Sequence, residues 1–299
     1  MAAPTLNGQL ICASNYAYAI QKDSTLATDS ESERYSAGVG FVQPPTPFVG
    51  IETRDINACL VGSIPAGVIV AFRGTLPPMA FSLQVVLDWL NDLSAIPVPS
   101  AGMPGRVHEG FLHSLDSLWA QIKEETLRQL AEAGAGAELF ITGHSKGGGM
   151  APLAAWRFLK EVAIKARVVT FAGAKCGDVP FTEAYNQVIE QDRFEFADDI
   201  VPHLPMSAGF LNRIKPPALF VHPFQTVQTF NYEPTGTLRY IRRNLEILDD
   251  SPELADERVK SLAHAIGTLH FKQVIDDHRV GCGFGYMSSA CPDGVCDPS

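Results

Sequence analysis

The 299-residue sequence predicts an α/β fold with a mostly parallel central sheet and helices on both faces. Short segments rich in β-branched residues alternate with segments of helical periodicity, a pattern typical of parallel sheets covered on both sides. In addition, one predicted strand runs through a glycine-flanked serine directly into a predicted helix. No repeat, low-complexity segment or long linker divides the chain, so we expect residues 1–299 to form one domain.

The first predicted elements form a hairpin and a long helix. Residues 56–63 and 66–74 are rich in β-branched residues and flank a turn-like "IPAG", which predicts two central strands. Residues 110–134 carry apolar side chains close to the 3.6-residue period of a helix and end at Gly134. This spacing predicts a long helix that packs one face on the core.

The later segments continue the alternation. We expect strands at 137–142, 166–173 and 193–197, further strand candidates at 218–224 and 236–243, and helices at about 146–162, 178–190 and 251–275. Ser251 is predicted to cap the last helix, because acidic residues follow it near the positive end of the helix dipole.

Charge and hydropathy exclude some classes of partner. The chain carries 33 acidic and 23 basic residues, and its net charge of −10 repels a nucleic-acid backbone, so we expect no nucleic-acid partner. No apolar run is long enough for a transmembrane segment. The first residues show no secretory signal, which leaves the compartment open between a cytoplasmic protein and a secreted mature form.

The six cysteines include no CxxC pair, and we expect no metal site. Cys282, Cys291 and Cys296 lie in or near a C-terminal tail at about 286–299. Their spacing fits either a disulfide that clamps this tail or a set of inert thiols.

A serine lies between two glycines where a predicted strand meets a predicted helix. The stretch "ITGHSKGG" places Gly143 and Gly147 on either side of Ser145, in the G-x-S-x-G arrangement. A strand–serine–helix turn of this kind is so tight that the flanking positions need glycine, and it presents the hydroxyl as a nucleophile. A plain glycine turn with an exposed serine is the alternative interpretation.

A serine nucleophile needs a histidine base and an orienting carboxylate, which follow it along the chain in this arrangement. Asp198 and Asp199 come just after a predicted strand. The downstream histidines are His203, His222, His264, His270 and His278. His264 and His270 fall within a predicted helix, where histidines usually pack or face solvent, whereas His278 precedes a glycine-rich loop that could carry an imidazole over the sheet.

Five segments of the chain occur in an order that is characteristic of one family. They are "VIVAFRGT", "DWLNDLSAIPVP" followed by "VHEGFLHSLDSLW", "ITGHSKGG", "TFAGAKCGDVPF" and "ADDIVPHLP". With these segments the chain resembles the class 3 lipases, the family of the filamentous-fungal triacylglycerol lipases, from about residue 10 to 290. The resemblance implies an α/β-hydrolase fold with a helical lid.

The resemblance also implies roles for particular residues. Ser145 would be the nucleophile, Asp199 the orienting acid and His278 the base, with backbone N–H groups of Thr75 and Lys146 forming the oxyanion hole. The interval from Asp199 to His278 is long for the family, so His264 and His270 remain fallback bases. The family commonly has leucine at position 146, and a lysine there opposes the helix dipole by up to about 1 kcal/mol.

Residues 76–93 correspond to the family's lid. Periodicity alone favours a core-facing helix, but the resemblance implies a flap whose apolar side covers the site in water and turns toward a lipid surface. Its predicted substrate-contacting residues are Met79, Phe81, Leu83, Val86, Trp89 and Leu90. We therefore expect transient contact with a lipid interface.

The implied function is hydrolysis of carboxylic esters, with a triacylglycerol as the expected substrate and no cofactor. Alternatives within the fold are an esterase for soluble or aromatic esters, a phospholipase or an acyltransferase. A non-catalytic module that binds a lipid or another hydrophobic partner is a further alternative.

Overall fold

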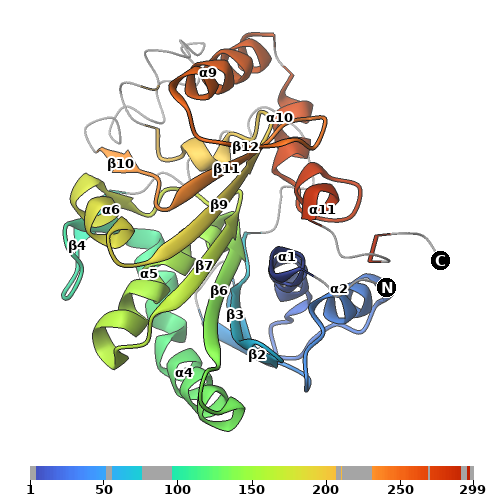
Figure 1. Ribbon diagram of the computed structural model, residues 1–299, viewed down its shortest axis with the longest axis vertical. Helices are drawn as coiled ribbons and strands as arrows, with labels where there is room; N and C mark the ends of the chain where they lie inside the picture. Colours follow the sequence, from blue (N-terminus) through green and yellow to red (C-terminus); the bar gives the residue numbers. More distant parts are fainter. Residues whose placement is uncertain are drawn as a thin grey trace.

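The centre of the molecule is an eight-stranded sheet (Figure 1). The structure is a computed structural model that describes residues 5–51, 56–75, 96–206, 210, 231–268, 270–290 and 295–296. The strand order is β1-β2-β3-β6-β7-β9-β11-β12. The strands are β1 (Thr46–Ile51), β2 (Ile56–Ile64), β3 (Gly67–Phe72), β6 (Glu138–His144), β7 (Ala166–Phe171), β9 (Glu190–Phe196), β11 (Thr237–Ile241) and β12 (Ile247–Asp249).

The five middle strands, β3, β6, β7, β9 and β11, are parallel, which confirms the expected mostly parallel sheet. The hairpin predicted near residue 65 is the antiparallel pair β2–β3, and antiparallel neighbours also complete both edges. Every residue of β3 is buried, as is every residue of β6 after Glu138. Burial on both faces explains why these segments are continuous apolar runs rather than alternating patterns.

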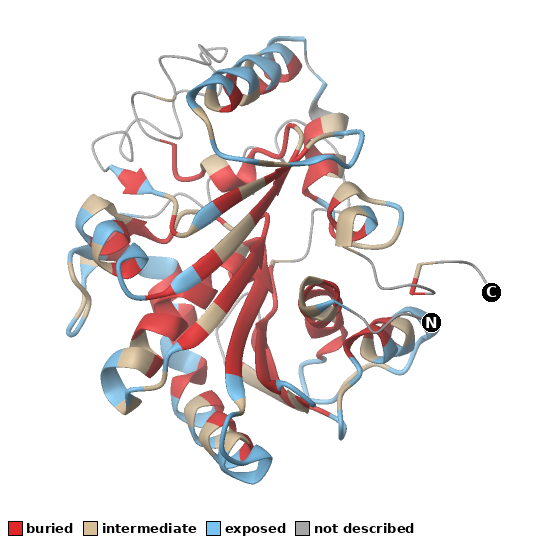
Figure 2. Cartoon of the chain, viewed as in Figure 1, coloured by how far each residue is buried: buried red, intermediate tan, exposed pale blue. Residues whose placement is uncertain are grey.

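Helices cover both faces of this sheet. The helices α4 (Glu109–Ala133), α5 (Lys146–Val162) and α6 (Val179–Asn186) contribute to one apolar cluster, together with α9 (Pro252–Gly267) and α10 (Phe271–His278). On the other face, α1 (Leu6–Tyr16), α2 (Ser30–Val39) and α11 (Gly285–Ala290) pack around a second cluster. Figure 2 shows buried residues along the strands and on the helix sides that face them. This three-layer arrangement is the one predicted from the alternation of elements.

Four short strands form a second, antiparallel sheet in the order β10-β8-β5-β4. They are β4 (Pro97–Pro99), β5 (Arg106–His108), β8 (Gly177–Asp178) and β10 (Tyr232–Glu233), and the sequence pattern did not predict them. Two single 3₁₀ turns, η1 (Ala17–Ala19) and η2 (Val201–His203), follow α1 and β9. Strands of two or three residues are too short for an alternating pattern to reveal.

Two predicted helices differ from the observed ones. The single helix expected over 251–275 is wrong, because α9 ends at Gly267 and α10 begins at Phe271. The hydroxyl of Thr268 donates to the carbonyl of His264 at 2.6 Å, and such side-chain bonds compete with helix continuation. The helix expected over 178–190 ends earlier, at Asn186. The chain then turns as the N–H groups of Val188 and Ile189 both donate to the Tyr185 carbonyl.

Other predictions have different outcomes. The helix expected to end at Gly134 is confirmed, with Gly134 as its cap at φ 86°. The lid predicted at 76–93 and the strand candidate at 218–224 lie outside the described residues. Within the predicted tail, residues 285–290 form α11, which buries Tyr286 and Met287.

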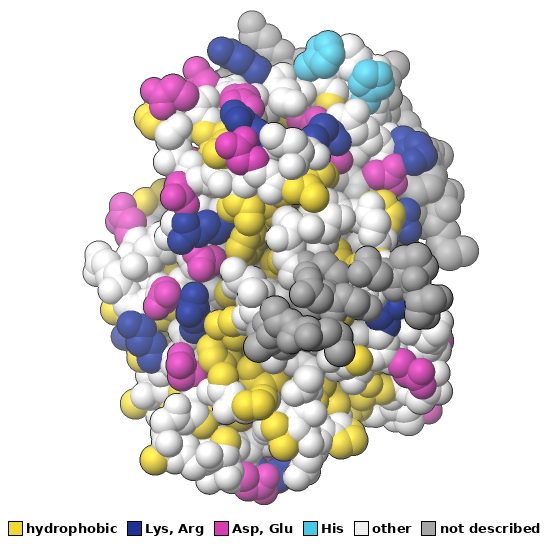
Figure 3. All heavy atoms as spheres, turned by 45° about the vertical axis from the view of Figure 1, so that its right-hand side comes forward, with side chains coloured by type: hydrophobic (Ala, Val, Ile, Leu, Met, Phe, Trp, Pro, Cys, Tyr) yellow, Lys and Arg dark blue, Asp and Glu magenta, His cyan; other side chains and the backbone are white. Residues whose placement is uncertain are grey.

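The surface shows mixed charge. On the face in Figure 3, acidic and basic side chains are interspersed among hydrophobic ones. No helix in the described part of the chain is both long and apolar enough to cross a membrane.

Candidate active site

Ser145 occupies the turn between strand β6 and helix α5, with φ 58° and ψ −125°. The turn brings backbone segments so close that side chains are excluded. A Cβ at Gly143 would lie 2.4 Å from the carbonyl of Gly147, and a Cβ at Gly147 would lie 2.3 Å from the carbonyl oxygen of Phe72. The two motif glycines are therefore required by packing, as predicted from the sequence.

The Ser145 side chain is fully buried, and its Oγ makes no hydrogen bond within the described part of the chain. The next residue, Lys146, begins α5, so its backbone N–H lies at the positive end of that helix. The lysine side chain binds a residue of another strand: its Nζ donates to Asn57 Oδ1 at 2.8 Å. This contact gives the cation a polar partner on strand β2.

Asp199 and His278 form a buried pair. His278 Nδ1 lies 3.0 Å from each carboxylate oxygen of Asp199, and the two residues are 4% and 2% exposed. Asp199 also accepts hydrogen bonds from the N–H of Val201 at 2.9 Å and from the hydroxyl of Tyr286 at 2.7 Å. These donors hold the carboxylate in one orientation, and the carboxylate in turn orients the imidazole.

The neighbouring carboxylate, Asp198, faces a different group. Its Oδ2 accepts from Arg243 Nη2 at 2.8 Å and from Gln273 Nε2 at 2.9 Å. The structure therefore pairs Asp199, the residue that the family resemblance indicated, with His278. His278 is the last residue of α10 rather than part of the loop that follows.

The other downstream histidines lie apart from this pair. His264 and His270 are both exposed. His203 stacks on Phe210, with ring centroids 4.6 Å apart, and burial lowers its pKa to about 3. His222 lies outside the described residues.

Packing brings the proposed oxyanion loop next to the serine, and the His278 ring next to the residue that precedes the serine. A Cβ at Gly74 would lie 3.1 Å from the Cβ of Ser145, so the loop that carries Thr75 touches the nucleophile turn. The ring of His144, the residue before Ser145, lies 4.6 Å from the ring of His278, centroid to centroid. Thr75 and His278 also line the same cavity.

A sequence model of the lipase (class 3) family matches residues 69–208. The match begins in β3, includes the Ser145 turn and ends beyond Asp199. This segment is therefore similar to the class 3 lipases, as the sequence motifs indicated.

Curated relatives are similar to part of this chain. Lipase ZK262.3 of Caenorhabditis elegans is 30% identical over 154 residues, which cover 49% of this chain and 40% of that protein. Phospholipase A1-II 4 of Oryza sativa subsp. japonica is 30% identical over 208 residues, which cover 57% and 50%. The chain therefore spans half or less of the length of these two relatives.

Solved structures share the fold over most of the chain. The triacylglyceride lipase of Rhizomucor miehei has a TM-score of 0.63 at 18% identity, covering 96% of this chain and 98% of that one. The lipase of Rhizopus microsporus var. chinensis has a TM-score of 0.62 at 17% identity, covering 94% and 87%. These likenesses confirm the predicted α/β-hydrolase fold.

Tyr18, in the turn after α1 and outside the residues that match the family model, joins the site through His144. Its hydroxyl lies 2.7 Å from His144 Nδ1, and His144 Nε2 lies 2.7 Å from the backbone carbonyl of His278. A carbonyl only accepts, so Nε2 carries the proton and the Tyr18 hydroxyl donates to Nδ1. Burial, followed by the charge of His278, lowers the pKa of His144 well below its usual value. No motif in the sequence pointed to Tyr18.

Arg243 joins the two segments that carry the acid and the base. It donates through Nη2 to Asp198 at 2.8 Å and through Nη1 to Asp277 at 2.9 Å, while Asp277 Oδ2 also accepts from the backbone N–H of Asp198 at 3.1 Å. Asp277 directly precedes His278. The arginine therefore holds the end of α10 against the loop after β9, an arrangement that sequence reasoning missed.

No group of three or more histidine, cysteine, aspartate or glutamate side chains within the described residues could hold a metal ion.

Proposed function

We propose that this chain hydrolyses carboxylic esters of lipids, with Ser145 as nucleophile, His278 as base and Asp199 as orienting acid. The observation that carries the proposal is the buried Asp199–His278 pair, whose imidazole lies 4.6 Å from the ring of His144, the residue before the serine at a strand–helix turn. The match of residues 69–208 to the class 3 lipase family supports the same chemistry.

Hydrolysis begins with transfer of the serine proton. Because His278 Nδ1 donates to Asp199, the neutral imidazole has its lone pair on Nε2. Nε2 takes the proton from Ser145 Oγ as the oxygen attacks the ester carbonyl carbon. The serine–histidine contact in such sites is often loose before substrate binds, and Ser145 Oγ makes no hydrogen bond in the described part of this chain.

The negative oxygen that forms needs donors that are already in place. The backbone N–H of Lys146 at the start of α5 and that of Thr75 in the adjacent loop are the proposed donors. His278 then gives its proton to the leaving alcohol, which leaves an acyl group on Ser145. Water, activated by the same imidazole, releases the fatty acid and restores the serine.

A serine-directed fluorophosphonate probe tests the nucleophile. We expect covalent labelling of the wild-type chain and no labelling of Ser145→Ala, because only a histidine-activated serine attacks the phosphorus. Ser261→Ala, on the exposed side of α9, is the matched control and should label like the wild type. Absence of labelling in the wild type would instead favour the non-catalytic binding module.

A triacylglycerol is the proposed substrate, since the predicted lid residues are apolar. Esterase, phospholipase and acyltransferase activities are the alternatives within the fold. A series of p-nitrophenyl esters of increasing chain length, compared with a triglyceride emulsion, separates lipase from esterase. Trp89→Ser should lower the ratio of emulsion to soluble-ester activity, and an unchanged ratio would count against the lid.

A further inference from the structure

A cavity of about 370 Å³ opens directly beside His278 and Thr75. Its volume lies within the range of roughly 300–1,000 Å³ that is usual for small-molecule sites. One wall comes from η1 and the beginning of α2, and the other from residues 279–284, which follow α10. Whatever occupies this cavity therefore lies next to the proposed base.

The lining of the cavity combines apolar side chains with charged ones. The α2 side carries Asp29, Glu31 and Tyr35, and the opposite segment carries Arg279. An acyl chain needs apolar walls, because it cannot replace the hydrogen bonds that charged walls make with water. The charged part of the lining is suited to a polar alcohol portion of an ester, which His278 must protonate as it leaves.

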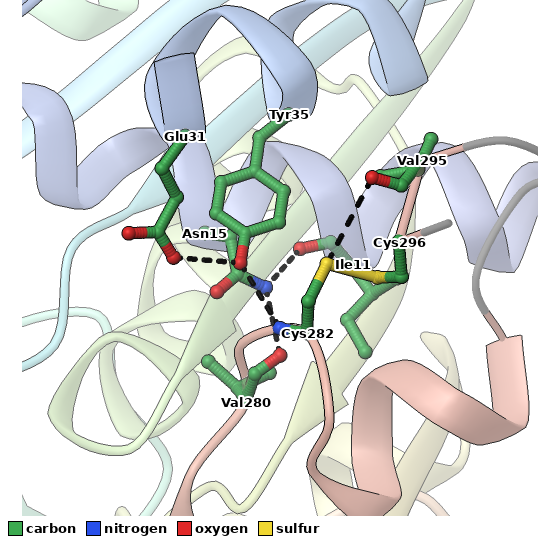
Figure 4. Close-up of a disulfide and its surroundings, with 8 residues drawn as sticks. All are labelled: Ile11, Asn15, Glu31, Tyr35, Val280, Cys282, Val295 and Cys296. Atoms are coloured by element: carbon green, nitrogen blue, oxygen red, sulfur yellow. Dashed lines mark hydrogen bonds between the residues drawn. A yellow bond between two sulfur atoms is a disulfide. The ribbon is translucent and has the colours of Figure 1, made fainter. Parts of the chain in front are cut away.

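The α2 wall is held in place by hydrogen bonds that Figure 4 displays. The Tyr35 hydroxyl donates to Glu31 Oε1 at 3.0 Å and accepts from the N–H of Cys282 at 3.1 Å. Asn15 Nδ2 donates to the carbonyl of Val280 at 3.1 Å. These contacts join the two walls of the cavity, and the bond from Tyr35 gives the Glu31 carboxylate a defined position.

The opposite wall presents a cation. The Arg279 guanidinium lies over the ring of Phe284, 4.2 Å from its centroid, and its Nη1 is 3.9 Å from Asp276 Oδ1. A guanidinium stacked in this way keeps its N–H groups in the ring plane, where they can bind a phosphate. The cavity thus has two carboxylates on one side and a phosphate-binding group on the other.

We propose that this cavity binds the zwitterionic headgroup of a choline-type glycerophospholipid. Arg279 binds the phosphate, while Glu31 and Asp29 bind the quaternary ammonium, with the Tyr18 and Tyr35 rings beside them. The substrate is then that of the phospholipase alternative rather than a triacylglycerol, and the reaction consumes a phospholipid and water and yields a fatty acid and a lysophospholipid. The hydrolytic part of this inference rests on the proposed function, whereas headgroup binding does not.

Binding of the headgroup is measured without hydrolysis, by calorimetric titration of glycerophosphocholine into the wild-type chain. We expect a saturable Kd in the millimolar range, because the headgroup alone lacks the acyl chains. Glu31→Gln keeps an acceptor for Tyr35 and removes the charge, so it should weaken binding about three- to tenfold. Glu33→Gln, on the same helix but outside the cavity lining, is the matched control and should bind like the wild type.

A second ligand distinguishes binding of the phosphate by Arg279 from binding of the ammonium by Glu31. Glycerophosphoglycerol carries the phosphate without the ammonium, so Arg279→Gln should weaken its binding and Glu31→Gln should not. Arg106→Gln, an exposed arginine outside the cavity lining, controls for loss of positive charge. Absence of saturable binding by glycerophosphocholine, or equal binding of galactosylglycerol that neither variant changes, would overturn the proposal.

Activity distinguishes failure of this inference from failure of the proposed function. We expect Glu31→Gln to lower kcat/KM for phosphatidylcholine relative to p-nitrophenyl butyrate, by the same factor as it weakens glycerophosphocholine binding. Hydrolysis of both esters with an unchanged ratio would contradict the headgroup site and leave the hydrolase intact. Headgroup binding without hydrolysis of either ester would contradict the hydrolase and leave the headgroup site intact.

Discussion

His144 is held neutral by the groups around it, and its neutral state favours proton uptake by the proposed base, His278. Its ring is buried between the Tyr18 hydroxyl and the carbonyl of His278, and it lies 4.6 Å from the His278 ring. A charged His144 would oppose the imidazolium that forms on His278 during proton transfer. The Tyr18 hydroxyl favours the neutral tautomer, because it donates to Nδ1 while Nε2–H is used on the carbonyl.

Tyr18→Phe tests this positioning role. The change removes the donor to His144 Nδ1, and we expect kcat for a p-nitrophenyl ester to fall about tenfold with little change in KM, which corresponds to about 1.4 kcal/mol. Tyr16→Phe, two residues earlier, is the control. A change in KM alone, or equal effects of both substitutions in steady-state kinetics, would argue against the role.

At the scale of elements, a disulfide joins residue 296 to the segment that follows α10. Cys282 and Cys296 are bonded, which decides between the two interpretations that their spacing allowed. Cys282 also donates its N–H to Tyr35, so the bond connects the end of the chain to α2 through the same residue. The disulfide thereby restrains the segment that begins directly after His278.

Removal of this bond should lower stability. For a closed loop of this length we expect Cys296→Ser to reduce the free energy of unfolding by about 2–4 kcal/mol, measured by urea denaturation. Dithiothreitol should reproduce the loss in the wild type and have little effect on Cys296→Ser. If the reductant shifts the unfolding midpoint of both proteins equally, the bond is not the source of the stability.

The contact between α10 and the loop after β9 depends on Arg243. Asp198 and Asp277 are buried side by side, and burial raises the pKa of Asp277. We expect Arg243→Gln to lower the free energy of unfolding by about 1–3 kcal/mol near neutral pH, because two buried carboxylates lose their cation. Arg242→Gln, whose partners Glu246 and Glu257 are exposed, is the control and should cost little.

The loss of unfolding free energy in Arg243→Gln should become smaller as the pH falls. Without the arginine, the folded carboxylates bind protons more readily than those of the unfolded chain, so acidification favours the folded variant relative to the wild type. The difference in unfolding free energy should therefore shrink as the pH falls through the acidic range. A difference that is constant or grows in urea titrations at several pH values would rule out this explanation.

For the molecule as a whole, histidines that the fold keeps neutral limit stability in acid. Burial, followed by the charges of Lys175 and Arg193, lowers the pKa of His203 to about 3, and burial also lowers the pKa of His144. An unfolded histidine titrates near about 6.5. Between these values the unfolded chain binds more protons, so stability falls as the pH drops from about 6.5 toward 3.

His203→Gln should remove part of this acid sensitivity. Relative to the wild type, the variant is expected to gain about 2–3 kcal/mol of unfolding free energy as the pH falls from about 7 to about 4. Urea titrations at both pH values measure the change, and His264→Gln, at an exposed site, is the control. Parallel pH profiles for the wild type and His203→Gln would show that His203 is not buried in its neutral form.

The sequence by itself determined the features that depend on neighbouring residues. The long helix ending at Gly134, the hairpin around residue 65 and the serine turn between Gly143 and Gly147 all follow from local spacing and backbone sterics. The fold class followed from their order along the chain. These features could be predicted because each is set by contacts within a few residues or by a period that burial imposes.

The tertiary structure decided the contacts between distant segments. Asp198 and Asp199 are the same residue type in adjacent positions, and only the turn after β9 directs one toward His278 and the other toward Arg243. Tyr18 reaches His144 across 126 positions of the chain. No periodicity or motif reports such a pairing, because it depends on how the helices and strands pack and not on the local pattern of either segment.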